Sequence, residues 1–96
     1  DLRFAKMQGS RCIGARFTGS QLQQTDFRAA NLTEAILDGA ESIKGADFSQ
    51  AMGLDKIQLA NLLARSHIEL DCWNPLTRQA TRTTLESLLE STTSPA

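Results

Sequence analysis

The chain is short of the residues that metal sites, membrane spans and nucleic-acid surfaces require. It has two cysteines and one histidine in 96 residues. Two thiols allow at most one disulfide and provide no zinc site by themselves. No apolar run approaches the roughly 20 residues that a membrane-spanning helix needs. The net charge is −1, whereas general nucleic-acid binders usually carry a basic excess. These scarcities favour one small domain without a metal, a membrane span or a nucleic-acid partner.

What the sequence has instead is a five-residue period. Large residues recur at every fifth position from residue 2 to residue 37, and a small residue precedes most of them by two places. The large residues are Leu2, Met7, Cys12, Phe17, Leu22, Phe27, Leu32 and Leu37, and the small ones are Ala5, Ser10, Ala15, Ser20, Thr25, Ala30 and Ala35. A helix repeats every 3.6 residues and a strand every 2. The spacing therefore predicts a square coil, in which the chain turns a corner every five residues.

Three units, "TDFRA" (25–29), "ANLTE" (30–34) and "ADFSQ" (46–50), resemble the A-[DN]-[LF]-x-x consensus of the pentapeptide-repeat family. The resemblance covers about residues 1–53. It implies a mainly β fold, a right-handed quadrilateral β-helix with four units per coil and about two and a half coils. Residues 20 apart would then stack in ladders, for example Met7 on Phe27.

The period slips once, in "AESIKGA" (40–46), where the small residues are six apart. We expect one extra residue near Lys44–Gly45, because glycine tolerates the unusual backbone of a bulge. Ile43, rather than Ser42, is then expected to point inward, and Phe48 to resume the series.

After Gly53 the period changes to that of helices. We therefore divide the chain into a β-solenoid over residues 1–53 and a helical C-terminal cap with a polar tail over residues 54–96. A first helix is expected in "LDKIQLANLLARS" (54–66). Its first turn offers a capping box formed by Asp55 and Gln58.

A second helix is expected in "TRTTLESLLES" (81–91), with Thr83 and Glu86 as its capping box. A turn at "NPLT" (74–77) precedes it, and "STTSPA" (91–96) is expected to be a frayed polar tail. Each helix carries a leucine stripe, which we expect to cover the last coil near Phe48 and Met52, although one helix could instead pair with another molecule. The stripes are Leu59, Leu62 and Leu63 in the first helix, and Leu85, Leu88 and Leu89 in the second.

The stretch "NPLTRQATRTTL" (74–85) resembles the C-terminal part of thylakoid-lumen pentapeptide proteins and their cyanobacterial relatives. The matching positions are Asn74, Thr77, Thr81, Arg82 and Leu85. Those relatives often finish with Gly or Cys, whereas this chain continues as "ESLLES". The resemblance implies a thylakoid-lumen, cyanobacterial-lumen or periplasmic location, and a cytoplasmic one stays open. Because the chain starts at Asp1 inside a repeat unit, we expect that any targeting segment has already been removed.

Cys12 and Cys72 are the candidate redox residues. Cys12 occupies an inward position, which favours an inert buried thiol. A disulfide needs Cα atoms within about 7 Å, so a bridge forms only if the segment after the first helix folds back along the coil.

The other candidate sites have structural interpretations that we favour. His67 is expected near the end of the first helix, where a cation favours the helix dipole, and Trp73 is expected to pack in the cap. Asn31 begins a glycosylation sequon, which the repeat consensus explains. We favour a mixed solvated surface over a steering patch for the charges, which are Arg3, Lys6, Arg11 and Arg16 on the first coil and Asp38, Glu41 and Asp47 later.

Neither a catalytic constellation nor a cofactor motif is apparent. The sequence therefore predicts a non-enzymatic module, a monomer or weak homodimer, that presents a rigid surface to an unknown protein partner. A thiol-redox protein using Cys12 and Cys72 is an alternative, although a C-x-x-C pair is lacking. The resemblance offers a further alternative, because some pentapeptide-repeat proteins mimic DNA and bind topoisomerases. Those proteins are longer rods with a strongly acidic face, which a net charge of −1 does not match.

Overall fold

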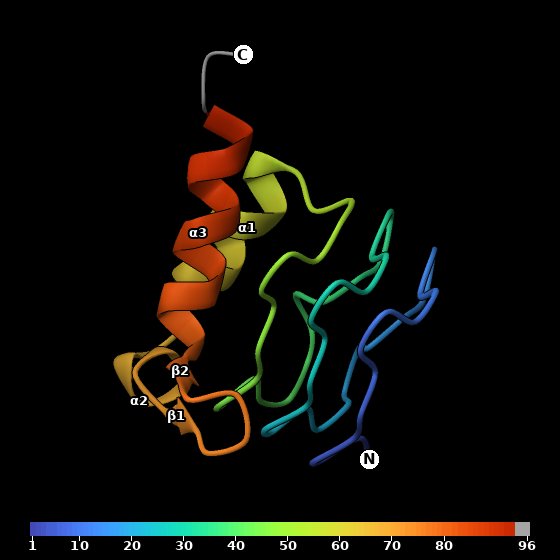
Figure 1. Cartoon of the computed structure of the whole chain (residues 1–96). Coiled ribbons are helices and arrows are strands. Elements are labelled where there is room, and N and C mark those ends of the chain that lie inside the picture. Colours follow the sequence, from blue (N-terminus) through green and yellow to red (C-terminus); the bar gives the residue numbers. More distant parts are fainter. Residues whose placement is uncertain (94–96) are drawn as a thin grey trace.

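The first half of the chain winds into a coil, and short helices and a hairpin stand against one end of it (Figure 1). The computed structural model describes residues 1–93, with side chains through Ser91. The elements are α1 (Lys56–Leu63), α2 (His67–Leu70), β1 (Trp73–Asn74), β2 (Gln79–Ala80) and α3 (Thr81–Thr93). Helices α1 and α3 pack against each other. No helix within residues 1–93 is long and apolar enough to cross a membrane.

Parallel bridges between single residues hold successive coils together. The first three join residues 20 apart, which agrees with the expected stacking: Lys6 with Asp26, Arg11 with Asn31, and Arg16 with Ile36. The next three join residues 21 apart: Gln21 with Ser42, Asp26 with Asp47, and Asn31 with Met52. Each coil therefore supplies a backbone edge on which the next coil pairs.

A tight turn follows each inward large residue. The Ala30 N–H, for example, donates to the Phe27 carbonyl at 3.0 Å. In most of these turns the third residue has a positive φ, for example 70° at Gly9 and 60° at Ala29, as a type II turn requires, whereas Gly39 does not. Glycine adopts this conformation freely, whereas Phe4, at φ 63°, must be held there by the surrounding ladder.

Stacked side chains fill the inside of the coil. Phe27 lies in the middle of one ladder, with its ring centroid 5.3 Å from Phe48 in a stacked pair and 5.6 Å from Phe17 edge to face. Both geometries are favourable for aromatic rings. Phe27 and Phe48 are fully buried, but Leu2 and Met7 of the first coil are only half-buried. The core is therefore closed at one end and thins toward the other.

The extra residue forms a bulge at Glu41–Ser42. The Glu41 N–H donates to the Ser20 carbonyl at 2.8 Å, whereas the Ser42 carbonyl accepts from the Leu22 N–H at 2.9 Å. Two residues of one coil thus lie opposite a single residue of the coil below, which defines a β-bulge. This bulge changes the bridge interval from 20 to 21 residues.

The predicted position of the extra residue, Lys44–Gly45, was wrong. Those residues form a regular turn, and Gly45 has the positive φ, 75°, of the third turn position. Glycine there serves the turn that most units make, so it does not mark the insertion. Ile43 is fully buried, as predicted, and Ser42 takes a bridge position.

The first helix begins as predicted, but it ends early. The Asp55 side chain accepts from the Gln58 N–H at 2.8 Å, and the Gln58 side chain accepts from the Asp55 N–H at 3.1 Å, which completes the capping box. Ser66 then caps the separate short helix α2. His67 is therefore the first residue of α2, and its predicted place at the end of the first helix was wrong because Ser66 starts a new one.

Helix α3 begins where the hairpin ends, at Thr81. Thr83 therefore lies inside the helix, so the predicted capping box with Glu86 was wrong. The leucine stripes face inward as expected, with Leu59, Leu62 and Leu85 buried and Leu63, Leu88 and Leu89 partly buried against the core. The helix continues through residue 93, so the predicted frayed tail was wrong for residues 91–93, and residues 94–96 lie outside the described residues.

Candidate functional site

The two ends of the coil differ in how their main-chain groups are bound. In the second coil, the N–H groups of Leu22 and Phe27 donate to carbonyls of the coil above. One coil later, the corresponding N–H groups belong to Ile43 and Phe48, and no further coil follows. We call the surface formed by residues 38–53 the capped end, and the opposite surface, formed by residues 1–20, the open end (Figure 1).

Side chains of the helices accept the N–H groups of the capped end. The Ile43 N–H donates to Glu69 Oε2 at 2.8 Å, and the Phe48 N–H donates to Thr84 Oγ1 at 3.1 Å. Thr84 is fully buried, and its own hydroxyl donates to the Thr81 carbonyl at 2.8 Å. Because a buried N–H without a partner costs free energy, these acceptors replace the missing coil.

Side chains also donate to carbonyls near the same end. Gln58 Nε2 donates to the Ala35 carbonyl at 2.9 Å, and Arg65 Nη2 donates to the Ala40 carbonyl at 2.8 Å. Arg65 also pairs with Glu69, with 3.1 Å between Nε and Oε2 and less than a fifth of either side chain exposed. One guanidinium therefore binds the coil and orients the carboxylate that accepts from it.

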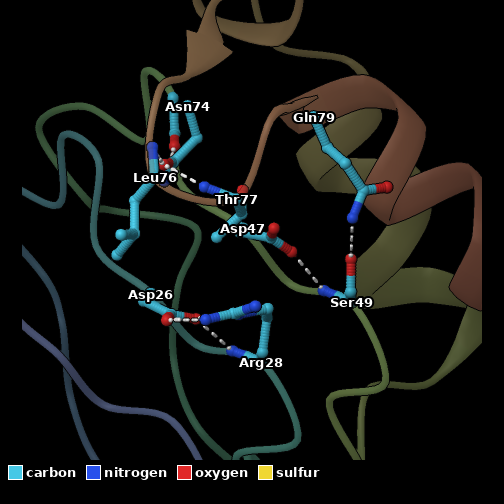
Figure 2. Close-up of polar contacts among 9 residues, drawn as sticks. Asp26, Arg28, Asp47, Ser49, Asn74, Leu76, Thr77 and Gln79 are labelled. Carbon is cyan, nitrogen blue, oxygen red and sulfur yellow. Dashed lines mark hydrogen bonds and ion pairs between the residues drawn. The ribbon is translucent and has the colours of Figure 1, made fainter.

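Asn74 fastens the hairpin to the coil (Figure 2). Its Oδ1 accepts from the N–H groups of Leu76 and Thr77 at 2.9 and 3.1 Å, which folds the hairpin loop. Its Nδ2 donates to the Gly45 carbonyl at 2.8 Å. Asn74 is 1% exposed, so both functions of its amide are used in the interior.

Two carboxylates stack on the coil face that carries the hairpin loop (Figure 2). Arg28 holds Asp26 with 2.9 Å between Nε and Oδ1 and 2.8 Å between Nη2 and Oδ2. Burial raises the pKa of Asp26, but the hydrogen bonds and charge of Arg28 outweigh this and leave the pKa below its ordinary value. Asp47, which was predicted to be a surface charge, is fully buried. The ladder and the hairpin loop enclose it (Figure 2), and its side chain accepts from the Ser49 N–H at 2.8 Å.

The two cysteines lie on different parts of the molecule. Cys12 is 6% exposed inside the first coil, and its Sγ is 3.2 Å from the Ser10 hydroxyl. Cys72 follows α2, and its Sγ lies 3.5 Å from the point where a Cβ on Gly45 would stand. Both thiols are free. The redox role of this pair stays a prediction.

The remaining candidates lie on the surface of the C-terminal segment. Trp73 is 56% exposed, so its predicted packing in the cap was wrong. Its neighbour Asn74 takes the inward position, and successive residues of a strand face opposite sides. His67 Nδ1 lies 3.4 Å from Arg82, which also forms an ion pair with Asp71 at 2.8 Å. Within residues 1–93, no group of three or more histidine, cysteine or acidic side chains is placed to hold a metal ion.

Comparison with known proteins identifies the repeat. The sequence model of the pentapeptide-repeat family finds eight copies of the repeat in this chain, over residues 1–33 and 10–52. Together these residues span more than half of the chain. The chain belongs to the pentapeptide-repeat family. The repeats of this family form β-solenoids, and its members are generally non-enzymatic proteins that typically serve as interaction modules.

This pentapeptide-repeat protein is similar to the crystal structure of a pentapeptide repeat protein from the Arabidopsis thaliana thylakoid lumen. The two chains are 22% identical, with a TM-score of 0.41, and the match covers 91% of this chain and 88% of the other. No curated protein matches the sequence.

Proposed function

We propose that this protein is a non-enzymatic interaction module whose rigid solenoid presents its outer surface to a protein partner. The filled interior of the coil supports the proposal. Leu22, Phe27 and Leu32 are fully buried, and no cavity of ligand size was found in residues 1–93. The groups that remain available for recognition stand on the outside, at positions that the five-residue period fixes.

We further propose a division of labour between two segments, a right-handed, four-sided solenoid of about two and a half coils over residues 1–53 and a cap over residues 54–96. The bridge intervals of 20 and 21 residues support four units per coil. The bonds from Glu69, Thr84 and Arg65 to the last coil support the cap. In this proposal the cap stabilises the solenoid, and the solenoid binds the partner.

A pull-down from an extract of the native compartment tests the function. The wild-type protein should retain a partner at moderate salt, and a Phe27→Asp control, in which the solenoid is destroyed, should not. Failure to retain any partner from that compartment would contradict the proposal. Inhibition of gyrase supercoiling at low protein concentration would favour the DNA mimic. Disulfide-reducing turnover that is lost in Cys72→Ser would favour the thiol-redox protein.

A further inference from the structure

The hairpin of β1 and β2 holds an exposed tryptophan on a fixed backbone, at the edge of the molecule (Figure 1). Trp73, the single tryptophan of the chain, is 56% exposed. On β1, the buried Asn74 fastens the hairpin to the last coil. On β2, Gln79 Nε2 donates to Ser49 Oγ at 3.1 Å. An aromatic side chain on a backbone that is already fixed loses little conformational freedom when a partner covers it.

A lysine of the last coil lies next to this tryptophan. Both neighbours of Trp73 contact Gly45 of the coil. Asn74 Nδ2 donates to its carbonyl at 2.8 Å, and the Cys72 Sγ lies 3.5 Å from the point where a Cβ on this glycine would stand. Lys44 is the residue before Gly45 and is exposed. The solenoid therefore contributes a cation to the surface around Trp73.

The hairpin loop contributes a second cation. The Arg78 N–H donates to the Asn74 carbonyl at 2.7 Å, which places Arg78 beside the residue that follows Trp73. Arg78 is exposed. Neither Lys44 nor Arg78 forms an ion pair within residues 1–93. We call the surface formed by Trp73, Lys44 and Arg78 the hairpin surface.

The carboxylate that lies closest to Trp73 along the chain is already bound. Asp71, two residues earlier, accepts from Arg82 with 2.8 Å between Nε and Oδ1. Asp71 therefore neutralises Arg82, and the two cations of the hairpin surface keep their charge for a partner.

Charge and shape decide which occupant the hairpin surface suits. A second copy of the chain would set cations against cations, and like charges placed against each other across an interface are costly. Single-stranded nucleic acids bind by stacking successive bases on several aromatic side chains, whereas this surface offers one ring. A protein segment with an apolar side chain between two carboxylates complements all three residues. Tryptophan and arginine are also the residue types most enriched among the energetic centres of protein interfaces.

We propose that the hairpin surface binds a protein segment that covers Trp73 with an aromatic or large aliphatic side chain and places Asp or Glu carboxylates against Lys44 and Arg78. The inference rests on the proposed interaction function, and it gives the hairpin a binding role in addition to its role in the cap. Because Lys44 belongs to the solenoid and Trp73 to the hairpin, the partner contacts both segments of the chain.

A synthetic peptide, Gly-Glu-Ser-Phe-Ser-Glu-Gly, provides the probe. In an extended chain its phenyl ring and both carboxylates lie on one face, because successive side chains alternate. We expect saturable binding of one fluorophore-labelled peptide per protein in anisotropy measurements. The unlabelled peptide should shift the Trp73 emission to shorter wavelength as it covers the ring, and no other tryptophan contributes to that signal.

Two matched peptides separate the contributions. Alanine in place of phenylalanine should weaken binding at least about tenfold, since an aromatic side chain no longer leaves water. Lysine in place of both glutamates should weaken binding at least about fivefold, since two ion pairs are replaced by repulsion.

Variants of the full chain locate the binding surface. Trp73→Ser should bind the glutamate peptide at least about tenfold more weakly, and Lys44→Glu/Arg78→Glu should lose it and gain the lysine peptide. Ile57→Ser removes another exposed apolar side chain, on α1, and is the control for the first variant. Arg16→Glu/Lys56→Glu makes the same change of net charge at exposed positions outside the hairpin surface. Both controls should bind as the wild type does, and circular dichroism verifies that all four variants are folded.

Several results would overturn the inference. These are the absence of saturable peptide binding, equal binding of the alanine peptide, an equal loss of binding in the control variants, displacement of the peptide by an equal concentration of oligodeoxythymidine, and a dimer that forms through Trp73. The pull-down distinguishes this failure from failure of the proposed function. A partner that Trp73→Ser retains as the wild type does would refute only the hairpin surface as its binding site.

Discussion

The two ends of the coil are made by the same repeat but are completed in different ways. At the capped end, Glu69, Thr84 and Arg65 supply the atoms that another coil would have supplied. At the open end, Lys6 and Arg11 keep their backbone groups unpaired within residues 1–93. The comparison teaches that a solenoid can be ended by side chains from a segment that does not share its repeat.

The two ends also differ in how deeply the inward side chains of one ladder are buried. Met7, Phe27 and Phe48 stack in successive coils, but Met7 is only half-buried whereas the other two are fully buried. Packing at the open end therefore contributes less to the free energy of unfolding than packing beneath the cap, because less apolar surface is removed from water.

The largest effect is expected from removal of the cap. A 1–53 fragment loses the buried leucines Leu59, Leu62, Leu70 and Leu85. Each is worth about 1.5–3 kcal/mol, against a total of about 5–15 kcal/mol for a small domain. We expect an unfolded or aggregated fragment by circular dichroism and light scattering. A monodisperse, β-rich monomer would show that the helices serve a partner and are not needed as a cap.

The next largest effect is expected from a charge inside the ladder. Phe27→Asp buries a carboxylate without a partner and should unfold the protein, since the cost of several kcal/mol is a large part of its stability. Met7→Asp, at the open end, should be milder because its side chain reaches solvent. Gln8→Asp is the exposed control. Urea unfolding measures all three, and equal stability of Phe27→Asp and the wild type would contradict the assignment of the core.

A smaller effect is expected from a single acceptor of the cap. Thr84→Val keeps the shape of the side chain but leaves the buried N–H of Phe48 without its 3.1 Å partner. We expect a loss of about 1–3 kcal/mol in the free energy of unfolding. Thr83→Val, one residue earlier and exposed on the same helix, is the matched control. If both variants lose the same free energy, the change reflects helix propensity and the Thr84 contact stabilises nothing.

The smallest effect is expected from acid. The pKa of Asp26 is lowered from its ordinary 3.8 in the folded protein. A lowered pKa means that the ion pair with Arg28 contributes stability above the ordinary pKa, and that this contribution is lost as pH falls through the folded value. Asp26→Asn should therefore flatten the loss of stability below about pH 4, measured by urea unfolding at several pH values. Glu34→Gln, at an exposed carboxylate, is the control, and an equal flattening there would contradict the account.

Much of the coil could be predicted from the sequence because its signals are local. The five-residue period placed the inward ladder, and the change of period near Gly53 placed the start of the helices. The inward position of Ile43 was predicted by allowing one extra residue in the five-residue period between Ala40 and Ala46. Asp55 and Gln58 lie three residues apart, so their capping box depends on no distant contact. A local glycine signal was misread, because Gly9, Gly14 and Gly19 mark the third turn position that Gly45 also fills.

The capped end could not be predicted because its contacts are long-range. Glu69 accepts a hydrogen bond from Ile43, which lies 26 residues earlier in the sequence, and Thr84 accepts one from Phe48, which lies 36 residues earlier. Neither residue has a neighbour in sequence that indicates this role. Asp47 was assigned to the surface because the hairpin that helps to enclose it is a two-residue pairing of strands, too short to produce a pattern of its own.

Native-state hydrogen exchange compares the two ends most directly, since it reports each backbone N–H in one folded molecule. The central claim is that side chains of the C-terminal segment close one end of the coil, whereas the backbone N–H groups of Lys6, Arg11 and Arg16 have no partner within residues 1–93. The account predicts slow exchange at Ile43 and Phe48, close to that of Phe27, and fast exchange at Lys6, Arg11 and Arg16. Fast exchange at Ile43 and Phe48, or protection at Lys6, Arg11 and Arg16 equal to that of Phe27, would contradict it.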